Sequence, residues 1–398
     1  MVRWFAAVLL GACAPTAFGL STPRVPNRIV RHTRLPVWPA WQGLALGVLS
    51  QIPPLRGVAD RLEDAFGGRV CPMQFDPNQA DPFILLVHHR HAFRAFDFLR
   101  PIFSAVIMPE GFPAHPHRGF ETVTYVLPGR AGLTHRDSEG CKMRYGDGAV
   151  QWMTAGRGML HEEMWDTQAG TDDAELYQLW VNLPPDAKFT SPRVQLLEPP
   201  TGASRGGASS PSAEVQREGA TSVRRAPLRE EVLDGGKVVV RTLASSPSVD
   251  AAASSSSPAE TYSPMTIAHV ELTSSDASYT LPLPEGWTCI VYVRRGAVSA
   301  GSDSVASMYE TAYFPRTGGD CLKLQNAASG LTDVLVLAGE PLGAPVVASG
   351  TMVMNSQREV SQALSDYQRG DFGIPWEHTL EDEEWAQQCD ARAARRAP

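Results

Sequence analysis

Two short stretches of the chain place residues of metal-ligand type at a spacing of two. HPHRGFE begins at His115 and contains His117, whereas HEE begins at His161 and ends at Glu163. Side chains at i and i+2 of a β-strand point to the same face, so each pair supplies two ligands from one strand. Three imidazoles and one carboxylate suit Fe(II), Mn, Ni, Cu or Zn better than Mg or Ca. We therefore expect these four residues to form a mononuclear metal site.

The segments around these pairs have the composition of β-strands. Short runs rich in Val, Ile, Thr and Tyr, such as TVTYVLPG, YQLWVNLPP and MTIAHVEL, alternate with Gly and Pro. This pattern is typical of an antiparallel β-sandwich or barrel. A helix is predicted near the end, where Ser356 and Glu359 form a capping box ahead of an apolar stripe. The sequence thus predicts an all-β fold with a short C-terminal helix.

The motifs of residues 111–164 resemble those of one known family. HPHRGFETV, an HxDS element, QWMTAGRG and HEE occur there in the order seen in the N-terminal domain of the pirin family, a branch of the bicupin superfamily. Residues 336–373 resemble the closing segment of the same family. The resemblance implies two tandem cupin (jelly-roll barrel) domains, of which the first holds a metal ion, usually iron. It implies as ligands His115, His117, His161 and Glu163.

The resemblance also bears on the polar residues beside these ligands. The general cupin motif HxHxxxE would coordinate through Glu121, but pirin-like proteins use the carboxylate that corresponds to Glu163. We expect Glu121 to hydrogen-bond a ligand imidazole and so fix its tautomer. Glu162 should face away from the metal, because neighbouring residues of a strand point to opposite faces. His135 and Asp137 are expected to organise a loop.

The remaining histidines are not expected to form a second metal site. His269 stands in MTIAHVEL without another ligand nearby, so the second domain should lack a metal and hold His269 half-buried in a strand. His88, His89 and His91 lie where the family has an acidic, Gly-rich segment. Because Arg90 among them repels cations, we predict a solvated loop there.

Two functions of different classes follow from the resemblance. Several pirin-like proteins resemble quercetin 2,3-dioxygenases, which open the central ring of a flavonol with O2 and release carbon monoxide. In that reaction the metal would act as a Lewis acid and Glu163 as the base for the 3-hydroxyl proton. The expected partners are then a flavonol-like aromatic molecule and O2. The alternative is a non-catalytic regulatory cofactor, dependent on iron or redox state, that binds a protein partner.

The net charge and the N-terminal sequence limit which partners and which cellular location are expected. The chain has 35 Lys and Arg against 43 Asp and Glu, a net charge of −8, so direct nucleic-acid binding is not expected. Residues 4–20 are apolar but too short and too broken by Pro15 for a membrane span, and no acidic residue precedes Asp60. This composition predicts a secretory signal or a plastid transit peptide and argues against the nucleus. The scattered cysteines are predicted to be free, with Cys389 exposed to solvent.

The predicted organisation has five parts. They are a targeting segment (1–57), the first cupin domain (58–200), a low-complexity insertion (201–225), the second cupin domain (226–376, with a disordered insertion at 244–258) and a tail (377–398) that could form a short exposed helix. Because two cupin domains already cover one another, we expect a monomer.

Overall fold

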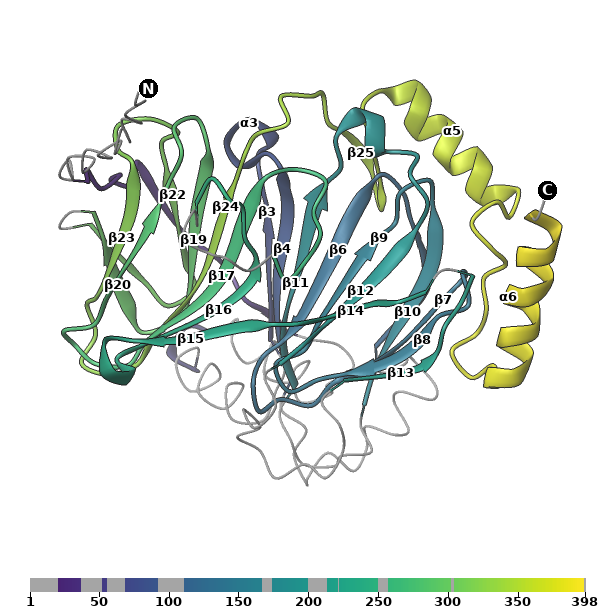
Figure 1. Ribbon diagram of the computed structural model, residues 1–398, viewed down its shortest axis with the longest axis horizontal. Helices are drawn as coiled ribbons and strands as arrows, with labels where there is room; N and C mark the ends of the chain where they lie inside the picture. The colour runs from purple at the N-terminus through teal and green to yellow at the C-terminus, as the bar shows by residue number, and fades with distance from the viewer. Residues whose placement is uncertain are drawn as a thin grey trace, which may run out of the picture.

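Two β-sandwiches lie side by side in the computed structural model (Figure 1). The structure describes residues 21–36, 52–55, 69–91, 111–166, 174–199, 213–220, 222–249, 257–301 and 304–396. Strands dominate these residues, so the predicted all-β fold is confirmed.

The N-terminal sandwich packs an eight-stranded sheet against a five-stranded sheet, counted over the described residues. The larger sheet has the order β14 (Arg224–Pro227), β12 (Arg193–Glu198), β9 (Val150–Thr154), β6 (Phe120–Val126), β11 (Ala174–Asn182), β4 (Phe83–His91), β3 (Arg69–Gln74) and β2 (Leu35–Pro36). The smaller sheet has the order β13 (Ala213–Arg217), β8 (Lys142–Tyr145), β7 (Leu133–Asp137), β10 (Met159–Trp165) and β5 (Gly111–His117). The two ligand pairs lie on β5 and β10, which are neighbours at one edge of the smaller sheet.

The C-terminal sandwich is built in the same way. Its larger sheet has the order β1 (Arg28–Arg31), β22 (Glu310–Phe314), β19 (Thr288–Arg295), β24 (Thr332–Gly339), β17 (Met265–Leu272), β16 (Val238–Ala244) and β15 (Arg229–Leu233). The smaller sheet has the order β18 (Ser278–Pro282), β23 (Cys321–Asn326), β20 (Ala297–Ala300) and β21 (Val305–Ser307). A separate hairpin consists of β25 (Val347–Ser349) and β26 (Met352–Met354).

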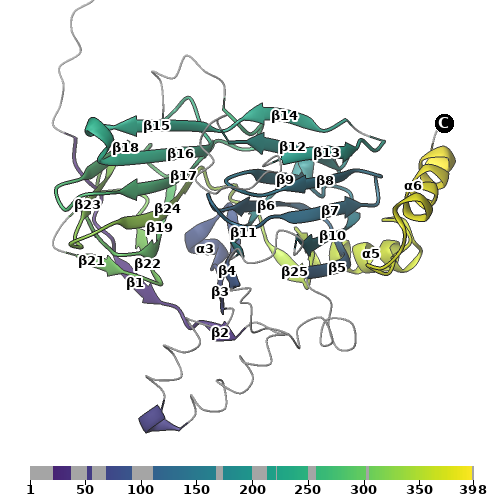
Figure 2. The ribbon, with the colours of Figure 1, turned by 90° about the horizontal axis from the view of Figure 1, so that it is seen from below.

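Part of the predicted targeting segment belongs to the folded domains. Strand β1 pairs with β22 of the C-terminal sandwich, and Figure 2 shows the two side by side. Arg24 is fully buried and donates hydrogen bonds to the carbonyl oxygens of Trp287 and Gly319, at 2.9 and 3.0 Å. Arg24 thus contacts residues 263 and 295 positions further along the chain, and the C-terminal sandwich includes part of the segment predicted at 1–57. The apolar stretch at 4–20 lies outside the described residues.

The insertion predicted at 201–225 is also partly structured. Residues 213–217 form β13, which pairs with β8 at an edge of the smaller N-terminal sheet, and β14 begins at Arg224. The insertion predicted at 244–258 is likewise partly structured, since Ala244 ends β16 and Val249 belongs to the C-terminal core. Residues 201–212, 221 and 250–256 lie outside the described part.

The helices among the described residues are few, and the two longer ones lie near the C-terminus. α3 (Pro77–Ala80), η1 (Pro53–Leu55), η3 (Pro185–Ala187) and η4 (Asp234–Gly236) are single turns, whereas α5 (Gln357–Gln368) and α6 (Asp382–Arg396) are longer. The predicted cap of α5 is confirmed, since the Ser356 hydroxyl accepts a hydrogen bond from the Glu359 amide. Among the described residues, none of the helices has the length and hydropathy needed to cross a membrane.

The tail forms the predicted helix, and one face of that helix packs against the protein while the other is exposed. Both views place α6 on the side of the N-terminal sandwich that carries the smaller sheet (Figures 1 and 2), and Asp382 of α6 pairs with Arg136 of β7 and Lys142 of β8. Trp385 is 1% exposed and Cys389 is 7% exposed, and both pack with Leu160 of β10. The prediction of a solvent-exposed Cys389 was therefore wrong. The apolar side chains of α6 pack against β10 of the N-terminal domain, and this contact buries Cys389. The five cysteines within the described residues are all free.

The two domains share one apolar core between their larger sheets. Val123 and Trp152 of the N-terminal domain belong to the same buried cluster as Ile267, Ile290 and Leu335 of the C-terminal domain. Burial of this shared surface removes it from water, so each domain stabilises the other.

A buried network of charged groups crosses the same interface. Glu175 Oε1 lies 3.0 Å from His88 Nε2 and accepts a hydrogen bond of 3.0 Å from Arg294. Arg294 also donates to Asp333, whose second oxygen lies 3.1 Å from His269 Nε2. Burial alone would raise the pKa of Asp333, but the neighbouring charges of His269 and Arg294 hold it well below its usual range. The pKa of Glu175 is lowered in the same way, against its burial, by His88 and Arg294.

This network predicts loss of stability in acid. Carboxylates with depressed pKa values in the folded state stabilise it above their unfolded pKa of about 4, and this contribution is lost as the pH falls further. We expect Asp333→Asn to lower the free energy of unfolding at pH 7 by about 3–5 kcal/mol, because Arg294 and His269 keep their burial but lose a charged partner. The variant should also show a shallower decline below pH 4. Urea denaturation across a pH series measures both effects.

Asp276→Asn is the matched control for this prediction. Asp276 pairs with Lys237 but has a 64% exposed side chain, so its loss should cost less than about 1 kcal/mol. Equal stability of the Asp333 variant and the wild type at pH 7 would contradict a structural role for the network.

Candidate metal centre

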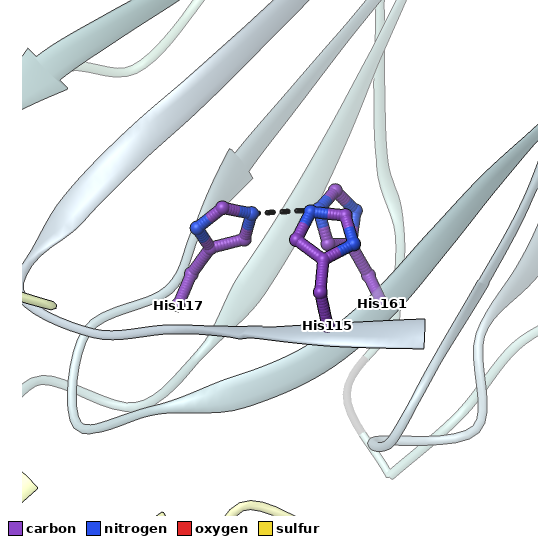
Figure 3. Close-up of side chains that lie close together, drawn as sticks. All are labelled: His115, His117 and His161. Carbon is purple, nitrogen blue, oxygen red and sulfur yellow. Dashed lines mark hydrogen bonds between the residues drawn. The ribbon is translucent and has the colours of Figure 1, made fainter. Parts of the chain in front are cut away.

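Three of the four predicted ligands converge inside the N-terminal sandwich. Strands β5 and β10 are antiparallel neighbours, and His161 is the direct cross-strand partner of His115. Because His117 lies two residues after His115, it projects from the same face of β5. Potential ligand atoms of the three histidines all lie within 4.8 Å of one another. Figure 3 shows the three imidazoles gathered from the two strands.

The surroundings of the three rings fit a metal ion. The Nε2 atoms of His117 and His161 face each other at 2.9 Å, while the Nδ1 atom of each ring is buried with no partner among the described residues. Burial, and then the nearby imidazoles, lower the pKa of both residues, so both are neutral as metal ligands must be. His115 Nδ1 lies 2.7 Å from the Pro113 carbonyl oxygen, which fixes its proton there and leaves Nε2 free to coordinate.

Glu163 lies next to this cluster but outside the group of close ligand atoms. A bulge between His161 and Glu163 shifts the register of β10, so that Glu163 stands opposite Phe112. The carboxylate is near enough for its charge to favour the protonated form of His115, although burial dominates and lowers the pKa of that histidine. The structure therefore unites the three imidazoles and places the carboxylate at their side.

Three hydrogen-bond donors hold the Glu163 carboxylate. Its Oε1 accepts from the Tyr145 hydroxyl at 2.5 Å and from the Thr124 hydroxyl at 2.8 Å, and its Oε2 accepts from the Gln178 amide at 2.9 Å. Burial and then the Glu163 charge raise the pKa of Tyr145 well above its usual value, so its hydroxyl remains a donor. Oε2 keeps an unused lone pair, which can accept a proton or contact a metal ion.

Sequence reasoning missed these three donors. Thr124 and Gln178 lie in the runs TVTYV and YQLWVN, where each is a polar residue between apolar ones. That alternation indicated polar side chains on one face of each strand, but strand pairing was needed to show that the faces meet at Glu163.

The role predicted for Glu121 was wrong. Its Oε1 accepts a hydrogen bond of 2.7 Å from the Thr154 hydroxyl, and it is the cross-strand partner of Val181, which belongs to the interdomain core. Thr124, three residues later, points to the other face and reaches Glu163. Glu121 thus faces away from the imidazoles, and burial raises its pKa to about 7.

Glu162 and Asp137 lie as the sequence predicted, whereas His135, expected to organise a loop, is buried in β7 beside the histidine cluster. Glu162 points to the outer face of β10 and accepts a 2.5 Å hydrogen bond from Arg136, which also donates to Leu380 of the tail. Asp137 accepts hydrogen bonds from the backbone amides of residues 139 and 141, which closes the turn after β7. His135 lies 3.1 Å from Asp137, and its ring is centred 5.4 Å from that of His161.

The histidines outside the cluster are more deeply buried than the sequence predicted. His88 and His89 lie on β4 and are 3% and 8% exposed, so the predicted solvated loop is wrong at these positions. His269 is buried on β17 and lies in one potential ligand group with Glu271 and Asp333. Both carboxylates already pair with arginine side chains, so this group is an ion-pair network and fits a metal poorly.

The fold and the site together define a two-domain cupin protein with a histidine cluster in its first barrel. The profile of the family described as Pirin matches residues 68–181, and that described as Pirin C-terminal cupin domain matches residues 267–373. The chain belongs to the pirin family. The predicted pair of tandem cupin domains is thereby confirmed.

Individual relatives cover most of the chain. A Pseudomonas aeruginosa protein provisionally named a quercetin 2,3-dioxygenase is 35% identical over 72% of this chain and 88% of its own length. Mouse pirin is 34% identical over 67% of this chain and 79% of its own length. The crystal structure of quercetin 2,3-dioxygenase from Acinetobacter baumannii superposes with a TM-score of 0.59 at 30% identity, over 77% of this chain and 92% of that one.

Proposed function

We propose that this protein is an Fe(II)-dependent dioxygenase that opens the central ring of a flavonol or a similar aromatic enol. The observation that carries the proposal is the convergence of three neutral histidines beside a carboxylate that three donors hold in place. Two relatives whose names are those of quercetin 2,3-dioxygenases support this choice of substrate.

His115, His117 and His161 would hold the metal ion, with Glu163 at its side. When bound there, the metal ion supplies Lewis acidity toward the deprotonated 3-hydroxyl of the substrate. Glu163 takes the proton of the substrate 3-hydroxyl on its Oε2 atom, which otherwise accepts only the hydrogen bond from Gln178. Tyr145 and Thr124 hold Oε1, so the carboxylate keeps its orientation while Oε2 accepts the proton. His117, His161 and Glu163 are buried, which limits their contact with bulk water.

The overall reaction would consume one flavonol and one O2 and produce one ring-opened ester and one carbon monoxide. The test is the stoichiometry of flavonol loss and O2 uptake by the full chain loaded with Fe(II). Equimolar consumption is expected. Flavonol loss without O2 uptake would overturn the proposal and indicate a different reaction. No loss with a metal-loaded protein would overturn it and favour a non-catalytic role for the metal.

A further inference from the structure

His89 is a buried histidine with an unsatisfied ring nitrogen. Its side chain is 8% exposed, and its Nδ1 has no hydrogen-bond partner among the described residues. Burial, followed by the charges of His91 and His88, lowers its pKa to about 3, so the ring is neutral. Buried polar atoms are almost always hydrogen-bonded, because an unpaired one costs about 1–3 kcal/mol. Within the described residues no group pairs with Nδ1, so this atom is available to a hydrogen-bonding group of a ligand.

Strand pairing shows that His89 faces the compartment of the metal centre. Across the β4–β11 pair, Val87 stands opposite Gln178 and His89 stands opposite Leu176. Paired residues point to the same face, and so do alternate residues of one strand. His89 and Gln178 thus share one face of the sheet, and Gln178 donates to Glu163 on that face. His88 points the opposite way, into the interdomain network.

His89 belongs to a group of four aromatic side chains, called here the aromatic wall: His89, His91, Phe112 and Trp165. The ring centres of His89 and Phe112 lie 5.3 Å apart, and those of His91 and Trp165 lie 4.7 Å apart. Phe112 is the cross-strand partner of Glu163. Trp165 follows Glu163 by two residues on the same strand, a rise of roughly 7 Å. The wall therefore begins beside Glu163 and extends away from the three metal-binding histidines.

We propose that the aromatic wall receives a hydroxylated aromatic ring of the substrate, with His89 Nδ1 hydrogen-bonded to a phenolic hydroxyl on that ring. This inference rests on the proposed function, since it states where the protein binds the part of the substrate that lies away from the cleaved bond. Planar aromatic rings pack well against Phe112, Trp165 and the imidazoles. A phenolic hydroxyl can donate or accept, so it satisfies Nδ1 in either tautomer of a neutral imidazole. A carboxylate would be desolvated without a charged partner, which disfavours acidic ligands.

Two substitutions at position 89 separate hydrogen bonding from packing. His89→Phe keeps a ring but removes the nitrogen, whereas His89→Asn loses the ring but retains a polar group near the position of Nδ1. Two ligands provide the second comparison: quercetin carries hydroxyls on its outer rings, and 3-hydroxyflavone lacks them. Binding to the Fe(II)-loaded full chain is measured without O2, so that affinity is determined independently of turnover. Metal content and circular dichroism are recorded for each variant.

We expect His89→Phe to weaken quercetin binding about three- to tenfold, which corresponds to the loss of one neutral hydrogen bond. Its affinity for 3-hydroxyflavone should stay within about twofold of wild type, and His89→Asn should bind quercetin better than His89→Phe does. Equal loss for both ligands, a weaker Asn variant than Phe variant, or no quercetin binding by the wild type would overturn the inference. Binding with the expected pattern but without turnover in air would support the inference and refute the proposed activity.

Discussion

Replacement of His161 by alanine is expected to abolish stoichiometric metal binding. His161 is fully buried, and its Nε2 lies 2.9 Å from that of His117, so its removal leaves two imidazoles where three converge. Loss of a residue that only supports a ligand typically weakens metal binding about 10–100-fold, and loss of a ligand itself should exceed that range. Metal analysis after equilibrium dialysis at micromolar Fe(II) measures the effect.

His32→Ala is the matched control for the His161 variant. His32 hydrogen-bonds Thr311 of β22 in the C-terminal sandwich and belongs to neither β5 nor β10. Its loss should leave one metal ion per chain. Circular dichroism must show that both variants are folded. An unchanged iron content in a folded His161 variant would refute the assignment of the site.

The second large effect is expected from Glu163→Gln. The amide cannot accept the 3-hydroxyl proton, and it presents an NH2 group to one of the donors that now surround the carboxylate. General bases contribute about 100- to 10,000-fold to rates, so kcat should fall within that range. The three histidines remain, so bound metal should persist. Steady-state kinetics on the metal-loaded variant provides the measurement.

Glu162→Gln separates this effect from a change in stability. Glu162 lies on the same strand but faces Arg136 and the tail, so its replacement should lower the melting temperature and leave kcat nearly unchanged. A Glu163 variant that turns over at the wild-type rate would remove this residue from the mechanism.

The convergence of the three histidines was predictable from one local rule together with the family resemblance. The spacing of two in HPH predicts a shared face on one strand, and the family resemblance links that strand to the one with HEE. The structure adds only that the strands are antiparallel neighbours with His115 opposite His161.

Glu121 shows where the same rule fails. It lies four residues after His117, so an unbroken strand would put both on one face. The chain instead turns at Gly119, whose φ of +84° suits glycine, and β6 begins anew at Phe120. A side chain at position 119 would also collide with the Val353 carbonyl. The turn inverts the alternation, and Glu121 faces the second domain.

The remaining errors concern contacts between distant segments. Burial of Arg24, Trp385 and His89 depends on strands that lie far away in the chain, and composition alone predicted exposure or disorder at these positions. Local sequence predicts which segments form strands and helices. It does not predict which surfaces of those strands and helices are covered by distant segments of the chain.

The measurement that tests the account most directly is carbon monoxide release from quercetin in air by the Fe(II)-loaded chain, with the His161→Ala variant as the blank. The wild type is expected to release one carbon monoxide per flavonol consumed, and the variant none above background. Equal release by both proteins, or none by a wild type that holds one iron per chain, would contradict it.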